Sequence, residues 1–176
     1  MRLRDHEAAA ECNAKIKLIG SAWKEDGKIV ECVRPCFVPA TNPLYSIADV
    51  FNGILACGNY TGDVMFYGRG AGAEPTASAV VSDIVDIVVS KDSPKKIYWE
   101  KADESEVFDY AEYAYSRYIS VAAADKDALL NSGIGVKQIA SDSDEFAVIT
   151  EPVSDRELAE ITAKVSLDIL ADICVL

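Results

Sequence analysis

Apolar and polar residues alternate in the amino-terminal part of the chain in a way that predicts two pairs of β-strands. The polar turn Lys24–Gly27 separates the first pair, and residues 58–60 separate the second. The four strands are expected at residues 15–22, 29–38, 50–57 and 61–67. Together they predict a four-stranded sheet, mostly antiparallel or mixed.

The apolar spacing changes to three and four residues after Pro75, which is the period of an amphipathic helix. The apolar stripe comprises Ala77, Val80, Val81, Ile84, Val85 and Val88. We expect this closing helix to pack on another surface through that stripe. The polar stretch Ser90–Lys96 contains a proline and is the best candidate for a linker.

The carboxyl-terminal part predicts a small βαββαβ unit, so the whole chain is assigned to the α+β class. Its elements are expected at residues 118–123, 125–131, 136–140, 146–150, 154–165 and 168–175. The second helix has a clear start, because Ser154 and Glu157 have the spacing of a capping box.

Composition and charge narrow the function classes. The chain has 176 residues, 50% of them hydrophobic, which is enough for a real core. The formal net charge is −12, with 9 basic and 18 acidic residues after residue 90, so nucleic acids and anionic membranes are not expected as partners. The longest apolar runs are far shorter than a membrane span of roughly 20 residues. The amino-terminal residues do not resemble a secretory signal, and a cytoplasmic location is expected.

The cysteines and the single histidine indicate no metal site. Cys12, Cys32, Cys36, Cys57 and Cys174 form an odd set without a Cys-x-x-Cys pair, and we expect them to be reduced packing residues. Cys32 and Cys36 would share one face of a strand, but supporting ligands are missing. His6, the only histidine, lies in a charged segment and is expected to be solvated.

The strongest chemical signal is the glycine-rich run before the closing helix. Gly68, Gly70 and Gly72 leave room for close backbone approach, and Pro75 is suited to the first helical turn. Taken alone this spacing is weak evidence, because tight turns use glycine for backbone reasons. It is not the first turn of a dinucleotide fold, which needs its own strand, helix and distant acidic residue.

The sequence of this run resembles the segment that closes the catalytic region of homoserine dehydrogenases. The run reads Phe66-Tyr-Gly-Arg-Gly-Ala-Gly-Ala-Glu-Pro-Thr-Ala-Ser-Ala-Val-Val-Ser-Asp83. The resemblance extends upstream through Ile16–Gly20, Val33–Pro35, Val38–Pro39, Asn42–Leu44 and Val50–Gly53. It implies an NAD(P)-dependent oxidoreductase that interconverts L-homoserine and L-aspartate 4-semialdehyde, in the pathway to threonine and methionine.

What the resemblance implies for individual residues is a contact surface for the cofactor. The expected cofactor-binding residues are Gly70, Ala71, Gly72, Glu74 and Thr76. The family's amino-terminal half, with its nucleotide-binding fold and its catalytic aspartate and lysine, has no counterpart among these residues. We therefore expect no catalytic residue here, no catalysis by this chain alone, and no tight binding of NAD or NADP without the other half.

The βαββαβ unit resembles an ACT-type regulatory domain, which implies an amino-acid effector near Asp125, Asp127, Ala128 and Leu129. The family's turn contains a proline and a glycine that are absent here, so a unit that only folds and pairs with its copy is the alternative.

The expected domains are residues 1–73, the end of the substrate and dimerisation domain; 74–96, the closing helix and linker; and 97–176, the ACT-like domain. Self-association, most simply as a dimer, is expected because an isolated copy of the sheet would expose an apolar face. Three function classes remain: part of an oxidoreductase, a free-standing amino-acid sensor, and a pairing module for a separate catalytic subunit.

Overall fold

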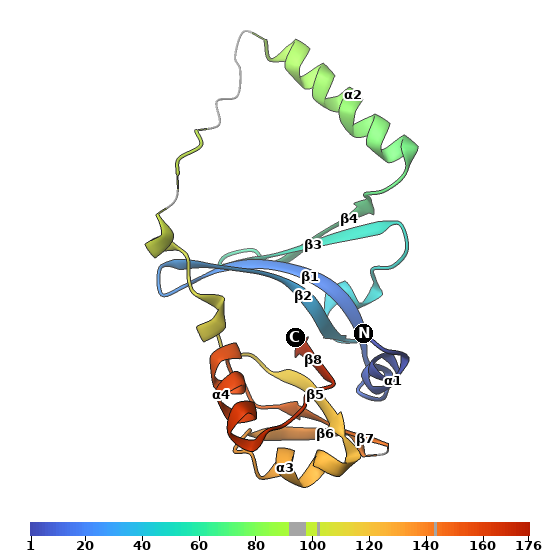
Figure 1. Ribbon diagram of the computed structural model, residues 1–176. Coiled ribbons are helices and arrows are strands. Elements are labelled where there is room, and N and C mark those ends of the chain that lie inside the picture. Colours follow the sequence, from blue (N-terminus) through green and yellow to red (C-terminus); the bar gives the residue numbers. More distant parts are fainter. Residues whose placement is uncertain (92–97, 102, 143) are drawn as a thin grey trace. The chain divides into compact units, whose positions relative to one another are not determined.

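The structure is a computed structural model that describes residues 1–91, 98–101, 103–142 and 144–176 (Figure 1). Its contacts divide the chain into two compact units. Unit 1 comprises Met1–Asn42 and Asp103–Leu176, and unit 2 comprises Pro43–Ala102. This division follows contacts within the chain, whereas the domains expected at 1–73, 74–96 and 97–176 follow from the resemblance to a family and stay a prediction.

Unit 1 is built on one six-stranded sheet in the order β1-β2-β8-β5-β7-β6. Its strands are β1 (Ala14–Glu25), β2 (Lys28–Pro39), β5 (Arg117–Ala122), β6 (Val136–Asp142), β7 (Glu145–Thr150) and β8 (Ala171–Val175). Its helices are α1 (Leu3–Glu11), α3 (Lys126–Leu130) and α4 (Asp155–Val165), with short 3₁₀ turns η2 (Glu104–Glu106), η3 (Tyr110–Glu112) and η4 (Ala123–Asp125).

The predicted four-stranded sheet is wrong, although both predicted strand pairs are confirmed. β1 and β2 pair with each other, and β2 then joins β8 in parallel through Cys36↔Cys174 and Phe37↔Val175. The second pair, β3 (Phe51–Gly58) and β4 (Gly62–Arg69), forms a separate two-stranded sheet in unit 2. Alternation predicts which face of a strand is buried, but it does not identify the neighbouring strand.

The hairpin between β1 and β2 is determined locally. Asp26 and Gly27 have φ values of 48° and 81°, so both central residues are left-handed, as a tight two-residue hairpin turn requires. The predicted turn at Lys24–Gly27 is confirmed.

The predicted order of elements in the βαββαβ unit is also confirmed. Its strands lie in the order β8-β5-β7-β6 with antiparallel neighbours, which is a split βαβ arrangement. The first predicted helix, 125–131, is shorter than expected: η4 turns directly into the five-residue α3. This strand order does not by itself define an ACT-type domain, and that assignment stays a prediction.

Helices pack on both faces of the unit 1 sheet (Figure 1). Along β5, Tyr118 belongs to a cluster with Ala8 and Ala9 of α1, whereas Ile119 belongs to a cluster with Leu158 of α4. α1 was not predicted from the sequence, because its buried residues are Asp5 and the small Ala8 and Ala9 rather than a wide apolar stripe. The backbone N–H of Arg2 donates to the buried Asp5 carboxylate at 2.7 Å and holds the start of α1.

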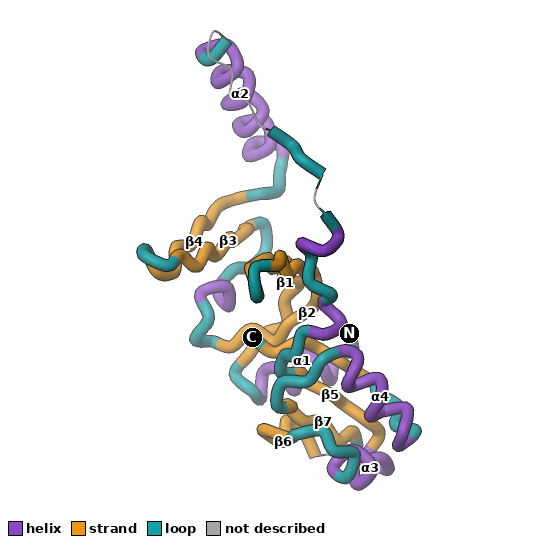
Figure 2. The backbone as a smooth tube through the Cα atoms, turned by 90° about the vertical axis from the view of Figure 1, so that its left-hand side faces the viewer, coloured by secondary structure: helices purple, strands orange, loops and turns teal. Residues whose placement is uncertain are grey.

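Unit 2 contains the second hairpin and the closing helix (Figure 2). A 3₁₀ turn, η1 (Pro43–Ser46), precedes β3, and the predicted closing helix is confirmed as α2 (Ala73–Val89). Most of the expected linker, residues 92–96, lies outside the described residues. Within the described part of the chain, none of the helices has the length and apolar character needed to cross a membrane.

Candidate functional site

The glycine loop joins β4 to α2, and a hydrogen bond holds its centre to the residue that precedes β3. The backbone N–H of Gly70 donates to the Val50 carbonyl at 3.3 Å. A Cβ at Gly70 would lie 1.7 Å from Nδ2 of Asn52, so the Asn52 side chain occupies the space beside the loop. A side chain at position 70 would therefore force the exposed Asn52 side chain to move, whether or not a cofactor is bound.

Gly72 is the residue that turns the chain into α2. Its φ of 119° and ψ of 158° fall in a region that is essentially restricted to glycine. No side chain caps the helix, and Pro75 stands in the first turn as predicted. The amides of Ala73 and Glu74 are first-turn donors, which have no intrahelical acceptor.

The expected cofactor-binding residues are gathered on this loop and the first turn of α2. Gly70, Ala71, Gly72, Glu74 and Thr76 are all exposed, and the Thr76 amide bonds back to the Gly72 carbonyl at 3.2 Å. The structure thus brings the five residues into one accessible segment. Their contact with a cofactor stays a prediction.

The apolar stripe of α2 is uncovered. None of its residues is buried, and seven large apolar side chains are each more than half exposed: Val80, Val81, Ile84, Val85, Ile87, Val88 and Val89. The expectation that this helix packs through its stripe is not met by any surface within the described residues.

The expected effector-binding residues lie around the start of α3. Leu129 is fully buried in the core, so only its backbone could face a ligand. Asp127 is exposed, and its carbonyl accepts hydrogen bonds from the backbone and side-chain amides of Asn131. Asp125 and Ala128 are partly buried.

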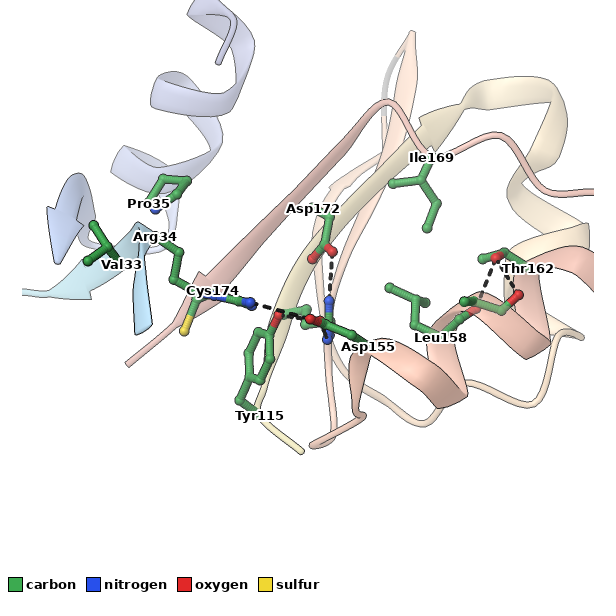
Figure 3. A pocket seen from close by; sticks show the side chains of 12 residues that line it. Val33, Arg34, Pro35, Tyr115, Asp155, Leu158, Thr162, Ile169, Asp172 and Cys174 are labelled. Atoms are coloured by element: carbon green, nitrogen blue, oxygen red, sulfur yellow. Dashed lines mark hydrogen bonds and ion pairs between the residues drawn. The ribbon is translucent and has the colours of Figure 1, made fainter. Parts of the chain in front are cut away.

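A charged cluster in unit 1, which was not singled out from the sequence, surrounds the buried guanidinium of Arg117. Figure 3 labels its neighbours Tyr115, Asp155 and Asp172. Arg117 donates to Asp172 at 2.6 Å, to the Val153 carbonyl at 3.0 Å and to Asp155, and it stacks on Tyr115 at 4.0 Å. The cluster could have been predicted from the sequence, because the mainly apolar strands β5 and β8 each contain one charged residue, Arg117 and Asp172.

Arg34 of β2 completes this cluster. Its guanidinium lies over the rings of Tyr110 and Tyr115, at 4.3 and 4.5 Å, and reaches Asp155 at 3.4 Å. The cluster borders a pocket of about 440 Å³ that Cys174 also lines. Burial raises the pKa of Asp172 above its ordinary value, while Arg117 and Arg34 oppose that rise.

Comparisons with known proteins place the chain in a class of proteins that is named for its dehydrogenases. Residues 1–85 match the family model of homoserine dehydrogenase. The homoserine dehydrogenase of Synechocystis is 49% identical over 69 residues, covering 39% of this chain and 16% of the relative. The Helicobacter pylori enzyme is 30% identical over 167 residues, covering 88% of this chain and 40% of the relative.

A solved homoserine dehydrogenase from Thiobacillus denitrificans has the same fold, with a TM-score of 0.75 and 24% identity over 98% of this chain and 45% of that structure. The chain therefore belongs to the homoserine dehydrogenase family, as the resemblance predicted. It spans less than half the length of these relatives.

Proposed function

We propose that this chain is the carboxyl-terminal part of a cytoplasmic homoserine dehydrogenase, which interconverts L-homoserine and L-aspartate 4-semialdehyde with NAD or NADP, and that it is inactive without the amino-terminal half. The Synechocystis and Helicobacter pylori relatives are both homoserine dehydrogenases, and the chain covers 40% of the one from Helicobacter pylori. The residues required for proton exchange during hydride transfer have no counterpart here.

The observation that carries this proposal is the uncovered stripe of α2. Large apolar surfaces are uncommon on soluble monomers and usually mark an interface. A helix of 17 residues with no buried residue gains little stability from its own unit. We propose that the nucleotide-binding half covers this stripe and thereby places the glycine loop beside the cofactor.

The residues of the loop indicate which groups of the cofactor it would contact. Gly70, Ala71 and Gly72 offer backbone with little side chain, which suits close approach to a flat or bulky ligand. Glu74 adds a negative charge in the first turn of α2, where a phosphate would be repelled. Neutral hydrogen-bonding groups, such as the ribose hydroxyls or the carboxamide of the cofactor, suit Glu74 and Thr76 better. The cofactor itself supplies or accepts the hydride.

The test is homoserine oxidation by the purified chain, by a separately expressed amino-terminal half of a related dehydrogenase, and by their mixture, with NAD and with NADP. Activity only in the mixture is the expected result. Activity of the chain alone would contradict the missing catalytic residues. A mixture that forms a complex but has no activity would contradict the proposed role of the loop.

The split βαβ order of unit 1 favours a second candidate, an ACT-type module that senses an amino acid or pairs subunits. The ligand would bind the backbone near Asp125, Asp127, Ala128 and Leu129. Titration calorimetry with threonine, methionine and lysine tests the sensor. No heat for any of the three at millimolar concentration would exclude it and leave a pairing role.

Homo-oligomerisation, with a dimer as the simplest form, is part of the same proposal. β3 and β4 form an isolated two-stranded sheet, and such a sheet is only marginally stable alone. Ile54 and Phe66 are exposed on paired positions of it. Sedimentation velocity over a range of concentrations tests this: a monomer at all of them would exclude self-association of the chain.

A further inference from the structure

Two cysteines far apart in the sequence meet where the β1–β2 hairpin joins the rest of unit 1. Cys36 of β2 and Cys174 of β8 are direct partners in the short parallel pairing of these strands. Neighbouring strands lie about 4.8 Å apart, which is within the Cα separation of roughly 4.4–6.8 Å that a disulfide spans. Both thiols are buried, at 3% and 8% exposure, and both are free.

The surroundings of the two sulfurs differ. Interaction with the Cys36 thiol lowers the pKa of Cys174, and the guanidinium groups of Arg34 and Arg117 lower it further against the effect of burial. The pKa of Cys36 is raised, chiefly by its interaction with the Cys174 sulfur and also by burial. Cys174 is thus the more acidic thiol of the pair, and Cys36 is the less acidic one.

Access also distinguishes the two residues. Cys174 lines the pocket beside Arg34 and Arg117, and Figure 3 shows the Cys174 and Arg34 side chains at the same end of that pocket. The pocket volume of about 440 Å³ is ample for a small, uncharged oxidant. Cys36 does not belong to the pocket lining and is only 3% exposed.

We propose that Cys174 and Cys36 form a peroxide-reactive dithiol, a site of reversible oxidative modification that links β8 to β2. The Cys174 thiolate attacks one oxygen of hydrogen peroxide, the O–O bond breaks, and the released hydroxide takes a proton to become water. The Cys36 thiol then attacks the Cys174 sulfenic acid, an S–S bond forms, and the second oxygen leaves as water. Two thiols lose two electrons and two protons in total, and one peroxide becomes two waters.

The disulfide would cross-link the ends of a long segment, residues 36–174, and would fasten the hairpin to the βαββαβ unit. Closing a long loop restricts the unfolded chain, so the oxidised form should melt at a higher temperature than the reduced form. Dithiothreitol should reverse the change.

The test uses the Cys57→Ser chain, because Cys57 is exposed and would otherwise join two molecules. After peroxide treatment and alkylation of the remaining thiols, we expect an intact mass with two fewer alkylated cysteines than the reduced sample. Trypsin releases Cys174 within residues 165–176, whereas Cys32 and Cys36 share one peptide because Arg34 precedes Pro35. Fragmentation of the linked peptide should place the bond at Cys36.

Matched variants decide the assignment. Cys36→Ala should abolish the internal cross-link, and Cys32→Ala should leave it intact. Arg34→Gln should slow cross-linking several-fold at neutral pH, because it removes a positive charge beside Cys174. A bond from Cys174 to Cys32, or no internal bond after complete peroxide treatment of the folded chain, would overturn the proposal. The fragmentation result on the chain with Cys32 and Cys36 intact decides this even if an alanine variant fails to fold.

Discussion

At the scale of single residues, Gly70 and Gly72 of the glycine loop are explained by different physical causes. At Gly70 the Asn52 side chain fills the space where a Cβ would stand, so a larger residue would displace that side chain. Gly72 is required because its backbone conformation is closed to other residues. A substitution at either position would therefore change the chain before any cofactor is present, and a loss of activity alone would not prove cofactor contact.

Replacing Gly72 with alanine should fray the start of α2. The strained conformation costs about 1–3 kcal/mol locally, so the Thr76 amide should lose its bond to the Gly72 carbonyl part of the time. Amide hydrogen exchange at Thr76 and Ala77 should become faster. Gly68→Ala is the matched control, because a Cβ there meets open space. Equal exchange in the two variants would contradict the strain argument.

The buried Arg117 guanidinium pairs with two carboxylates of unit 1. Arg117→Leu should destabilise unit 1 by about 3 kcal/mol or more, because it removes the ion-pair partner of Asp172 and leaves Asp155 with only Arg34 and the Tyr115 hydroxyl. Urea unfolding followed by Trp23 fluorescence, in a Trp99→Phe background, measures this.

The exposed Arg156 pairs with Glu112 at 2.6 Å and serves as the control for the Arg117 variant. Arg156→Leu should change the free energy of unfolding by no more than about 1 kcal/mol, since both side chains are in water. A similar decrease in the free energy of unfolding in the two variants would show that the buried position of Arg117 is unimportant.

At the scale of elements, the start of α4 is the part of the fold that local chemistry determined best. The predicted capping box is present: the Ser154 hydroxyl accepts from the Glu157 amide at 3.2 Å, and the Glu157 carboxylate accepts from the Ser154 amide at 3.0 Å. The Ser154 hydroxyl also donates to this carboxylate at 2.9 Å, and the two hydrogen bonds that the carboxylate accepts lower the pKa of Glu157 below its ordinary value of 4.5.

That lowered pKa predicts a pH dependence. Since the folded state holds the proton of Glu157 less tightly than the unfolded state, its contribution is fully present above pH 4.5 and is lost as the pH falls below that value. Unfolding experiments on the chain and on Glu157→Gln should show a stability gap at neutral pH that closes in acid. A gap that is constant down to the lowest measurable pH would contradict the charge-dependent cap.

Elements were predicted well where the signal is local and poorly where it is not. The two hairpins, α2 and the order of the βαββαβ unit follow from turn residues, periodicity and caps. The pairing of Cys36 with Cys174 does not, because it joins distant segments through two residue pairs whose side chains resemble those of any buried strand. α1 was missed because alanine is compatible with many buried settings.

The same distinction applies to the candidate site. The glycine loop was found because its residues are adjacent in the sequence and have a specific order. The Arg117 cluster was missed because its charged members come from β2, β5, β8 and the start of α4 and meet only after folding. Isolated charges in apolar strands, such as Arg117 and Asp172, predict a buried partner without identifying it.

At the scale of the whole molecule, substitutions in the apolar stripe of α2 should affect the binding of the amino-terminal half much more than the stability of this chain. Because Val81 and Ile84 are 57% and 55% exposed, Val81→Ser and Ile84→Ser should each change the free energy of unfolding by less than about 0.5 kcal/mol. In contrast, Val121→Ala, at a fully buried position, should cost on the order of 2 kcal/mol.

Assembly should reverse this ranking. If the amino-terminal half covers the stripe, the double variant Val81→Ser and Ile84→Ser should bind that half more weakly by tenfold or more, because two apolar side chains lose their burial at the interface. Val121→Ala should bind it normally at temperatures where it is folded. Calorimetric titration of the amino-terminal half into each variant measures both effects, and unchanged affinity of the double variant would mean that α2 docks through another face or not at all.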